Sequence, residues 1–224
     1  MMLCLENVLA ESLVRAFVTV LDDMSLYELG ARTAGKTARE RKQNLQAIPD
    51  KPEVQRVVSA VRDGLKQHSL FQRFAIPARI GRVTISRCEA GMSYGTHYDN
   101  AFIEGIRTDL SFTLFLSSAE TYEGGEVELQ SSMGAQSIKL PSGCALVYPS
   151  DQLHAVRPVL SGIRLATVGW VRSRVRSSVH RQLLFDLTQA TDLISNPETL
   201  DESMDTAATQ LKFVRNNLLR LWAE

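Results

Sequence analysis

The feature that most restricts the fold of this chain is a series of short, β-rich segments between residues 82 and 170. Glycine, proline, serine or aspartate separates them at intervals of roughly 8–12 residues, which is typical of an all-β sandwich or barrel. The segments are RVTISRC (82–88), DLSFTLFLS (109–117), GEVELQ (125–130), QSIKLP (136–141), ALVYP (145–149), HAVRPV (154–159) and IRLATVGW (163–170). We therefore expect a core of about seven or eight strands.

Helical periodicity flanks this core on both sides. Apolar residues recur at helical spacing over 10–25 and 51–69 before the core, and over 177–195 and about 200–222 after it. The predicted fold class is mainly β with flanking helices: a double-stranded β-helix (jelly-roll) core plus a C-terminal helical pair. We expect residues 1–175 to form the β domain with its N-terminal supporting helices, and residues 176–224 a helical extension.

Composition excludes several functional classes. Lys+Arg and Asp+Glu are equal at 25 each, so no charge excess attracts nucleic acid or an acidic membrane. The three cysteines, Cys4, Cys88 and Cys144, are widely spaced, which fits a reducing compartment. The apolar opening of the chain is interrupted by charges and has no leader-like features. We expect a cytoplasmic protein that binds neither nucleic acid nor membrane.

The stretch SYGTHYDN (93–100) places His97 and Asp99 two residues apart. We expect them just past the end of a strand, where side chains separated by two point to one side. Taken alone, the pair fits a structural turn as well as a metal site.

A metal needs a third ligand, and His154 is the best candidate among the other histidines. It begins a strand late in the predicted sheet, whereas His68 and His180 lie in helical segments and are expected at the surface. Two histidines and one carboxylate with the opposite face open suit a non-haem Fe(II) that reacts with O2.

Arg164 follows His154 by ten residues. If residues 160–162 form a hairpin loop, Val159 pairs with Ile163, and Arg164 shares the face of His154 about 13 Å along the strand. That gap suits a five-carbon dicarboxylate that chelates the metal and meets the guanidinium. A loop one residue shorter would reverse the face, and pairing with a structural carboxylate is the alternative role of this arginine.

Taken together, these motifs resemble the iron(II)- and 2-oxoglutarate-dependent dioxygenases of the prolyl/lysyl hydroxylase type, most closely the bacterial PKHD-type hydroxylases. The matching stretches are G-x-x-Y-G-x-H-x-D-N (91–100), RTDLSFTLFLS (107–117), YEGGEVEL (122–129), KLPSGCALVYPSDQLHAV (139–156), GIRLATVGWVRS (162–173) and NNLLRLW (216–222). The resemblance implies that His97, Asp99 and His154 bind iron and that Arg164 anchors 2-oxoglutarate. It further implies O2 as cosubstrate, succinate and CO2 as products, and ascorbate as a reductant that rescues oxidised iron.

One position departs from the family pattern. The family usually has an Arg-Tyr pair nine residues before the first iron-binding histidine, whereas this chain has Arg87-Cys88. A thiol is a weak donor, so either Tyr148 or a strand serine or threonine compensates, or the cosubstrate is bound less tightly. We expect three further residues at the substrate mouth: Tyr94, Tyr98 and Asn100. Tyr98 is bulky and is expected to narrow that mouth.

The polar, basic segment 30–50 is predicted to be a loop or flap over the mouth. Its cations are candidates for contact with an anionic substrate: Arg32, Lys36, Arg39, Arg41 and Lys42. The substrate itself is open, either a small molecule or a peptide side chain, because fold and site do not specify it.

Two other functions use the same site residues. A non-catalytic iron or 2-oxoglutarate sensor would act through the C-terminal helices, and a cupin-like protein would hold another divalent metal without 2-oxoglutarate. Arg164 argues against the cupin. The terminal apolar stripe (Leu211, Val214, Leu218, Trp222) either packs on the barrel or forms a homodimer interface, and its apolar character favours the dimer.

Overall fold

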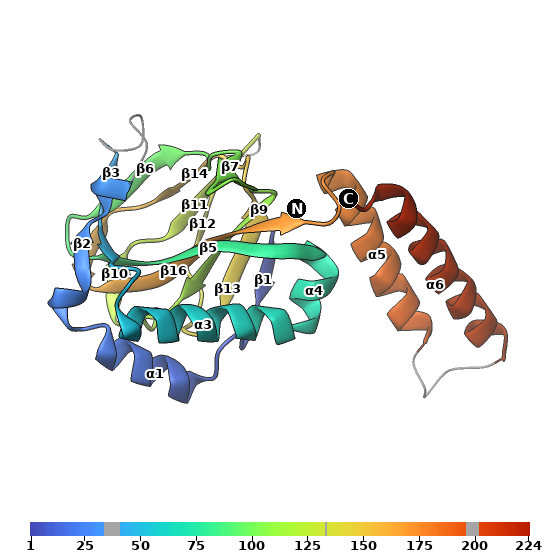
Figure 1. Cartoon of the computed structure of the whole chain (residues 1–224), viewed down its shortest axis with the longest axis horizontal. Coiled ribbons are helices and arrows are strands. Elements are labelled where there is room, and N and C mark those ends of the chain that lie inside the picture. Colours follow the sequence, from blue (N-terminus) through green and yellow to red (C-terminus); the bar gives the residue numbers. More distant parts are fainter. Residues whose placement is uncertain (34–40, 133, 196–201) are drawn as a thin grey trace.

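Two antiparallel sheets form the core of the computed structural model, which describes residues 1–33, 41–132, 134–195 and 202–224 (Figure 1). The larger sheet has the strand order β1-β13-β9-β16-β5-β4-β2, and the smaller has the order β12-β11-β14-β6-β3. Two short ladders, β10-β15 and β7-β8, complete the strands.

The strands are β1 (Leu3–Leu5), β2 (Tyr27–Leu29), β3 (Lys42–Gln43), β4 (Leu45–Ala47), β5 (Pro77–Cys88), β6 (Ser93–His97), β7 (Phe102–Ile103), β8 (Ile106–Arg107), β9 (Leu110–Phe115), β10 (Tyr122–Gly124), β11 (Val127–Ser131), β12 (Gly134–Ile138), β13 (Ala145–Pro149), β14 (His154–Val156), β15 (Val159–Gly162) and β16 (Arg164–Ser173). The helices are α1 (Glu11–Val20), α3 (Pro52–Gln67), α4 (Ser69–Ala75), α5 (Ser178–Ile194) and α6 (Glu202–Trp222), with 3₁₀ turns at Met24–Leu26 and Gly30–Thr33.

Alternation along the central strands of the larger sheet separates an apolar face from a polar one. In β9, Leu110, Phe112 and Leu114 belong to the main hydrophobic core, together with helix residues. The intervening Ser111 and Thr113 are also buried but point to the other side, because successive side chains of a strand face opposite ways. The sheet therefore packs its helices with one face and builds a polar interior with the other.

Helix α3 shows why the apolar face is stable. Proline at the first helical position needs no N–H partner, and Val54, Val57, Val61 and Leu65 recur at helical spacing. All four are at most 2% exposed in the main core, and burying each side chain contributes about 1.5–3 kcal/mol. Figure 1 shows α1 and α3 along one side of the strands, which leaves the opposite face of the sheet for the site.

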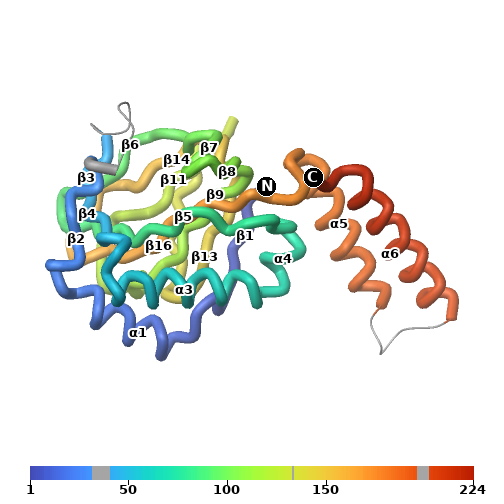
Figure 2. The backbone as a smooth tube through the Cα atoms, in the orientation of Figure 1, coloured from blue at the N-terminus to red at the C-terminus, as the bar shows by residue number. Residues whose placement is uncertain are grey.

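The C-terminal helices form a pair beside the β core. Figure 2 shows α5 and α6 side by side, at one end of the sheets. Phe185 meets Phe74 of α4 edge-to-face at 5.6 Å, and Trp222 stacks on His180 at 4.1 Å. The prediction of a mainly β fold with a C-terminal helical pair is confirmed, and none of the helices within the described ranges is long and apolar enough to cross a membrane.

The described part of the predicted loop or flap at residues 30–50 includes two short strands, β3 and β4. β3 pairs with β6 of the smaller sheet, and β4 pairs with β5 of the larger one. Alternating burial in this segment, with Asn44 and Gln46 buried, allows strand pairing although its composition is polar. The part of the predicted flap at 34–40 lies outside the described residues.

Candidate metal centre and cosubstrate pocket

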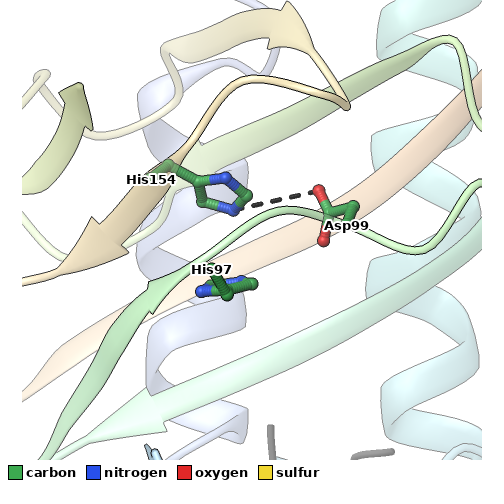
Figure 3. A group of neighbouring side chains, drawn as sticks. All are labelled: His97, Asp99 and His154. Carbon is green, nitrogen blue, oxygen red and sulfur yellow. Dashed lines mark ion pairs between the residues drawn. The ribbon is translucent and has the colours of Figure 1, made fainter. Parts of the chain in front are cut away.

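Strand pairing brings the three predicted metal ligands together. His97 is the last residue of β6, Asp99 follows two residues later, and His154 is the first residue of β14. β6 and β14 are antiparallel neighbours, with His97 directly opposite His154. Figure 3 shows the two rings and the carboxylate converging, and their ligand atoms all lie within 4.8 Å of one another.

Backbone carbonyls orient both imidazole rings. His97 Nδ1 lies 2.8 Å from the Gly95 carbonyl, and His154 Nδ1 lies 2.8 Å from the Gln152 carbonyl. A ring that donates its Nδ1–H to a carbonyl keeps the lone pair on Nε2, which is the arrangement found for metal-binding histidines. His154 Nε2 lies 3.8 Å from Asp99 Oδ2.

Two serines that the sequence did not indicate hold Asp99, one through its carboxylate and the other through its backbone N–H. Ser111 Oγ donates to Asp99 Oδ2 at 2.6 Å and lies 2.8 Å from Ser150 Oγ. The Asp99 N–H donates to the Ser150 carbonyl at 3.1 Å. The signal for Ser111 was its position on the polar face of LSFTLF, between apolar residues that pack on the helices.

Burial keeps the site ready for a metal at neutral pH. The pKa of His97 is lowered to about 4, mainly by burial and then by the neighbouring His154. Its ring is therefore neutral at pH 7, and only a neutral imidazole binds metal. Tyr94 stacks on His97 at 3.7 Å and has a pKa raised to about 12, mainly by burial. Two nitrogens and one carboxylate oxygen with the remaining side open fit Fe(II).

Arg164 lies in the interior, and no carboxylate of the described residues forms an ion pair with it. It is 1% exposed, and its Nε and Nη2 atoms have no hydrogen-bond partner among the residues that the structure describes. The Tyr122 hydroxyl is also buried and lacks a partner within the same described ranges. A Cβ built on Gly125 would lie 2.8 Å from Arg164 Cδ and 3.1 Å from Tyr122 Cε2, so these side chains are close neighbours. Such a set of buried donors fits the carboxylate of a bound dicarboxylate.

The predicted hairpin between residues 154–159 and 163–170 is wrong. β14 pairs with β11 and β6, whereas β16 pairs with β5 and β9 of the other sheet. Gly162, with φ +74°, ends a separate strand, β15, which pairs with β10. Arg164 and His154 nevertheless line the same cavity, because the two sheets face each other across it.

Cys88, which stands where the family usually has tyrosine, and Tyr148 both line the cavity that contains His154 and Arg164. Cys88 is 2% exposed and stands opposite Arg164 in the β5–β16 register. Tyr148 is buried and meets His154 at 5.0 Å, and burial followed by the charge of Asp99 raises its pKa, so its phenol stays neutral. The sequence did not indicate Tyr122 as a site residue, although it begins the YEGGEVEL motif.

A cavity of about 360 Å³ joins the metal site to Arg164. The three residues predicted at the mouth, Tyr94, Tyr98 and Asn100, all line it, and Tyr98 is 67% exposed. Among the predicted flap cations, Lys42 lines the cavity, and burial lowers its pKa to about 8.

Of the other predicted flap cations, the structure describes the side chain of Arg41 alone, and Arg41 is not among the residues that line the cavity. Arg41 donates to the Thr96 carbonyl. The side chain of Arg32, like Lys36 and Arg39, lies outside the described residues. Their predicted contact with substrate therefore stays a prediction.

Comparison with known proteins identifies the class to which this fold and site belong. A sequence model described as the 2OG-Fe(II) oxygenase superfamily matches residues 83–172, which span β5 to β16. Among solved structures, a Pseudomonas putida prolyl-4-hydroxylase has a TM-score of 0.55 at 20% identity, covering 77% of this chain and 92% of that one. A prolyl hydroxylase from Trichoplax adhaerens, solved with a hypoxia inducible factor peptide fragment, has a TM-score of 0.60 at 15% identity, covering 76% and 82%. These likenesses support the fold.

Relatives of higher identity define the family. A PKHD-type hydroxylase from Synechococcus sp. (strain JA-2-3B'a(2-13)) is 40% identical over 229 residues, and one from Idiomarina loihiensis is 38% identical over 224 residues; each match covers 100% of both chains. The chain belongs to the PKHD-type hydroxylase family of 2OG-Fe(II) oxygenases. It is thus an oxidoreductase, a hydroxylating dioxygenase that uses Fe(II), 2-oxoglutarate and O2, as the sequence predicted.

Proposed function

We propose that this protein hydroxylates a C–H bond of its substrate at an iron held by His97, Asp99 and His154. Bound Fe(II), with 2-oxoglutarate and O2, supplies the oxidising power and yields succinate and CO2. The two imidazoles and the carboxylate would hold the metal and would leave the cavity open to cosubstrate and substrate. Ser111 keeps the Asp99 oxygens oriented, since it donates to Oδ2 at 2.6 Å.

We propose that Arg164 and Tyr122 bind the far carboxylate of 2-oxoglutarate. The single observation that supports this most is the set of buried donors without partners: Arg164 Nε, Arg164 Nη2 and the Tyr122 hydroxyl, all unpaired within the described part of the chain. Buried donors that stay unpaired are costly, so a ligand that satisfies them gains that energy on binding. Tyr122 would then replace the donor that Cys88 lacks, and Tyr148 would border the cosubstrate beside His154.

Titration of the metal-free protein with Fe(II) and then 2-oxoglutarate, without oxygen, tests these roles. We expect the weak visible absorption band that arises when 2-oxoglutarate chelates Fe(II), followed by succinate once O2 is admitted. The band should be lost in His154→Ala and strongly weakened in Arg164→Met. Arg157→Met is the matched control, because Arg157 is 58% exposed and pairs with Glu128 at 3.5 Å. A band that survives His154→Ala would contradict the ligand assignment, and a band without succinate under any substrate would favour the sensor.

The use of ascorbate, the cytoplasmic location and the homodimer remain predictions. The use of ascorbate is tested by its effect on the number of turnovers before the iron is oxidised. A cytoplasmic location is consistent with the free cysteines Cys4, Cys88 and Cys144. The homodimer through the terminal stripe is tested by the molar mass in solution: Val214 of that stripe is exposed, whereas Trp222 stacks on His180 of α5.

A further inference from the structure

We propose that Arg82, with Lys42 and Trp170 beside it, binds an anionic group of the substrate, so that the substrate carries a carboxylate about 10 Å from the carbon that is hydroxylated. The inference rests on the proposed function for the position of the iron. It adds the chemical class of the substrate, which the family does not specify.

The strand register places Arg82 at the opposite end of the cavity from Arg164. From Arg82 onward, every second residue of β5 lines the cavity: Arg82, Thr84, Ser86 and Cys88. Cys88 stands opposite Arg164, so Arg82 lies six residues, or about 20 Å of strand, from the cosubstrate end. The two arginines therefore serve different ligands.

The distance from Arg82 to the iron follows from three neighbouring strands. Ser111 of β9, which donates to Asp99, is paired with Trp170 of β16. On the other side of β16, Gly169 pairs with Val83 and Val171 pairs with Ile80. Trp170 therefore lies opposite the short stretch of β5 that contains Arg82. Two strand spacings separate β9 from β5, so Arg82 lies about 10 Å across the sheet from the Asp99 side of the metal.

The charges around the cavity favour an anion. Among the described residues that line it, three are cationic (Lys42, Arg82, Arg164) and two are carboxylates (Asp99, Glu104). The charges of Fe(II) and of the 2-oxoglutarate dianion would cancel. The side chains that line the cavity therefore leave a net excess of one positive charge. With Arg164 assigned to the cosubstrate, that positive charge lies at the Arg82 end.

Two donors at this end are available for a ligand. The ion pair of Arg82 with Glu104 is long, at 3.7 Å, and Glu104 is 60% exposed, so a substrate carboxylate can replace it at little cost. The Trp170 indole N–H is buried on the cavity wall and has no acceptor among the residues that the structure describes. An unpaired indole N–H beside an exchangeable guanidinium is a binding site for a carboxylate.

The remainder of the substrate has room beyond Arg82. A second cavity, of about 420 Å³, lies between α3 and the β4–β5 edge and shares Arg82, Thr84 and Glu104 with the first. Its other wall includes Val54 and Val58 of α3. The anionic group would therefore sit where the two cavities meet, with the reacting carbon on one side and space for further atoms on the other.

Binding of octanoate and its uncharged isostere octanamide to the protein loaded with Mn(II) and 2-oxoglutarate tests the subsite. Octanoate is chosen because its extended chain spans the distance from Arg82 to the metal. We expect octanoate to bind about tenfold more tightly than octanamide, which corresponds to one charge-assisted pair. In the NMR spectrum, Mn(II) should broaden the terminal methyl signal more than the methylene next to the carboxylate.

Substitutions separate charge recognition from a general change of the mouth. Arg82→Gln should remove the preference for octanoate, and Arg82→Lys should retain most of it. Glu104→Gln should keep octanoate binding or strengthen it, because the competing carboxylate is gone. Arg56→Gln, on the exposed side of α3, is the matched control and should change nothing.

The outcomes distinguish this inference from the proposed function. If octanoate binds no better than octanamide to a protein that does form the Mn(II)–2-oxoglutarate complex, the subsite is refuted and the proposed function stands. Retention of the preference in Arg82→Gln, or its loss in Glu104→Gln, would also refute it. If the unaltered protein does not bind Mn(II) and 2-oxoglutarate, the proposed function itself fails.

Discussion

Replacing Arg164 by methionine should make the metal-free protein more stable while removing most of its response to 2-oxoglutarate. Arg164 is 1% exposed, and two of its three nitrogens have no partner in the described part of the chain. Methionine has a similar length, is apolar and adapts to irregular space. The substitution therefore removes a buried charge without leaving a large cavity.

The expected gain in the free energy of unfolding arises because methionine has no N–H donors to leave buried without a partner. Leaving a buried donor unsatisfied costs about 1–3 kcal/mol, and replacing buried charges by apolar groups of similar volume is often stabilising by about 1–4 kcal/mol. We take about 2 kcal/mol, which for a protein of this size raises the melting temperature by about 4–8 °C.

The loss of cosubstrate binding is larger. Truncating one partner of a buried, hydrogen-bonded charge pair costs about 2–5 kcal/mol, so the Kd for 2-oxoglutarate should rise by about 30-fold or more. In the unaltered protein, saturating Mn(II) and 2-oxoglutarate should raise the melting temperature, because a ligand that binds only the folded state stabilises it. In Arg164→Met, the increment from 2-oxoglutarate should nearly vanish.

Thermal unfolding with and without metal and 2-oxoglutarate measures both effects in one experiment. Arg164→Lys keeps the charge but loses the planar fork, and should bind 2-oxoglutarate with intermediate affinity. Arg157→Met should leave both quantities unchanged. The reasoning is refuted if Arg164→Met is less stable than the unaltered protein and still responds to 2-oxoglutarate, since Arg164 would then be a structural residue.

Three further outcomes follow from the same contacts. Gly125→Ala should lower stability and weaken 2-oxoglutarate binding, because φ is +67° and the new Cβ would lie 2.8 Å from Arg164 Cδ; unchanged binding would place the cosubstrate elsewhere. Ser111→Ala should weaken Fe(II) binding by about 10–100-fold, measured by metal competition, since Asp99 loses its donor. Metal-free protein should lose stability as the pH falls from about 6.5 towards about 4. The pKa of His97 is lowered to about 4 in the folded protein, so the unfolded chain takes up its proton first. In thermal unfolding across this pH range, His97→Asn should flatten the dependence.

Alternation in the β-rich segments made much of the site predictable. In RVTISRC (82–88), valine and isoleucine belong to the core, and the alternate residues Arg82, Thr84, Ser86 and Cys88 line the cavity. The same period in LSFTLF leaves Ser111 and Thr113 on the inner face. A strand with two buried faces, one of them polar, is unusual for a simple sandwich, and it indicates an interior that holds a ligand.

Long-range pairing was not predictable in the same way. A hairpin between 154–159 and 163–170 would need only a local turn, yet Val159–Gly162 pairs with Tyr122–Gly124 instead. The alternation of apolar and polar residues in the sequence does not distinguish the two pairings, because both are compatible with it. The position of Tyr122 near Arg164 depends on that distant pairing, which explains why the sequence did not predict it.

The polar inner face and the apolar outer face of the larger sheet are energetically linked. Arg164 Nη2 and Trp170 Nε1 have no partner in the part of the chain that the structure describes, and such buried donors destabilise the protein. The helix-facing residues of the same strands offset that cost by burial. A ligand that satisfies these donors therefore recovers free energy that the fold has already lost. Because the donors stand at opposite ends of one cavity, the protein can gain affinity for 2-oxoglutarate at Arg164 and for an anionic substrate at Arg82 independently. Arg82→Gln should accordingly leave the Kd for 2-oxoglutarate unchanged, and a large increase in that Kd would mean that both ends serve a single ligand.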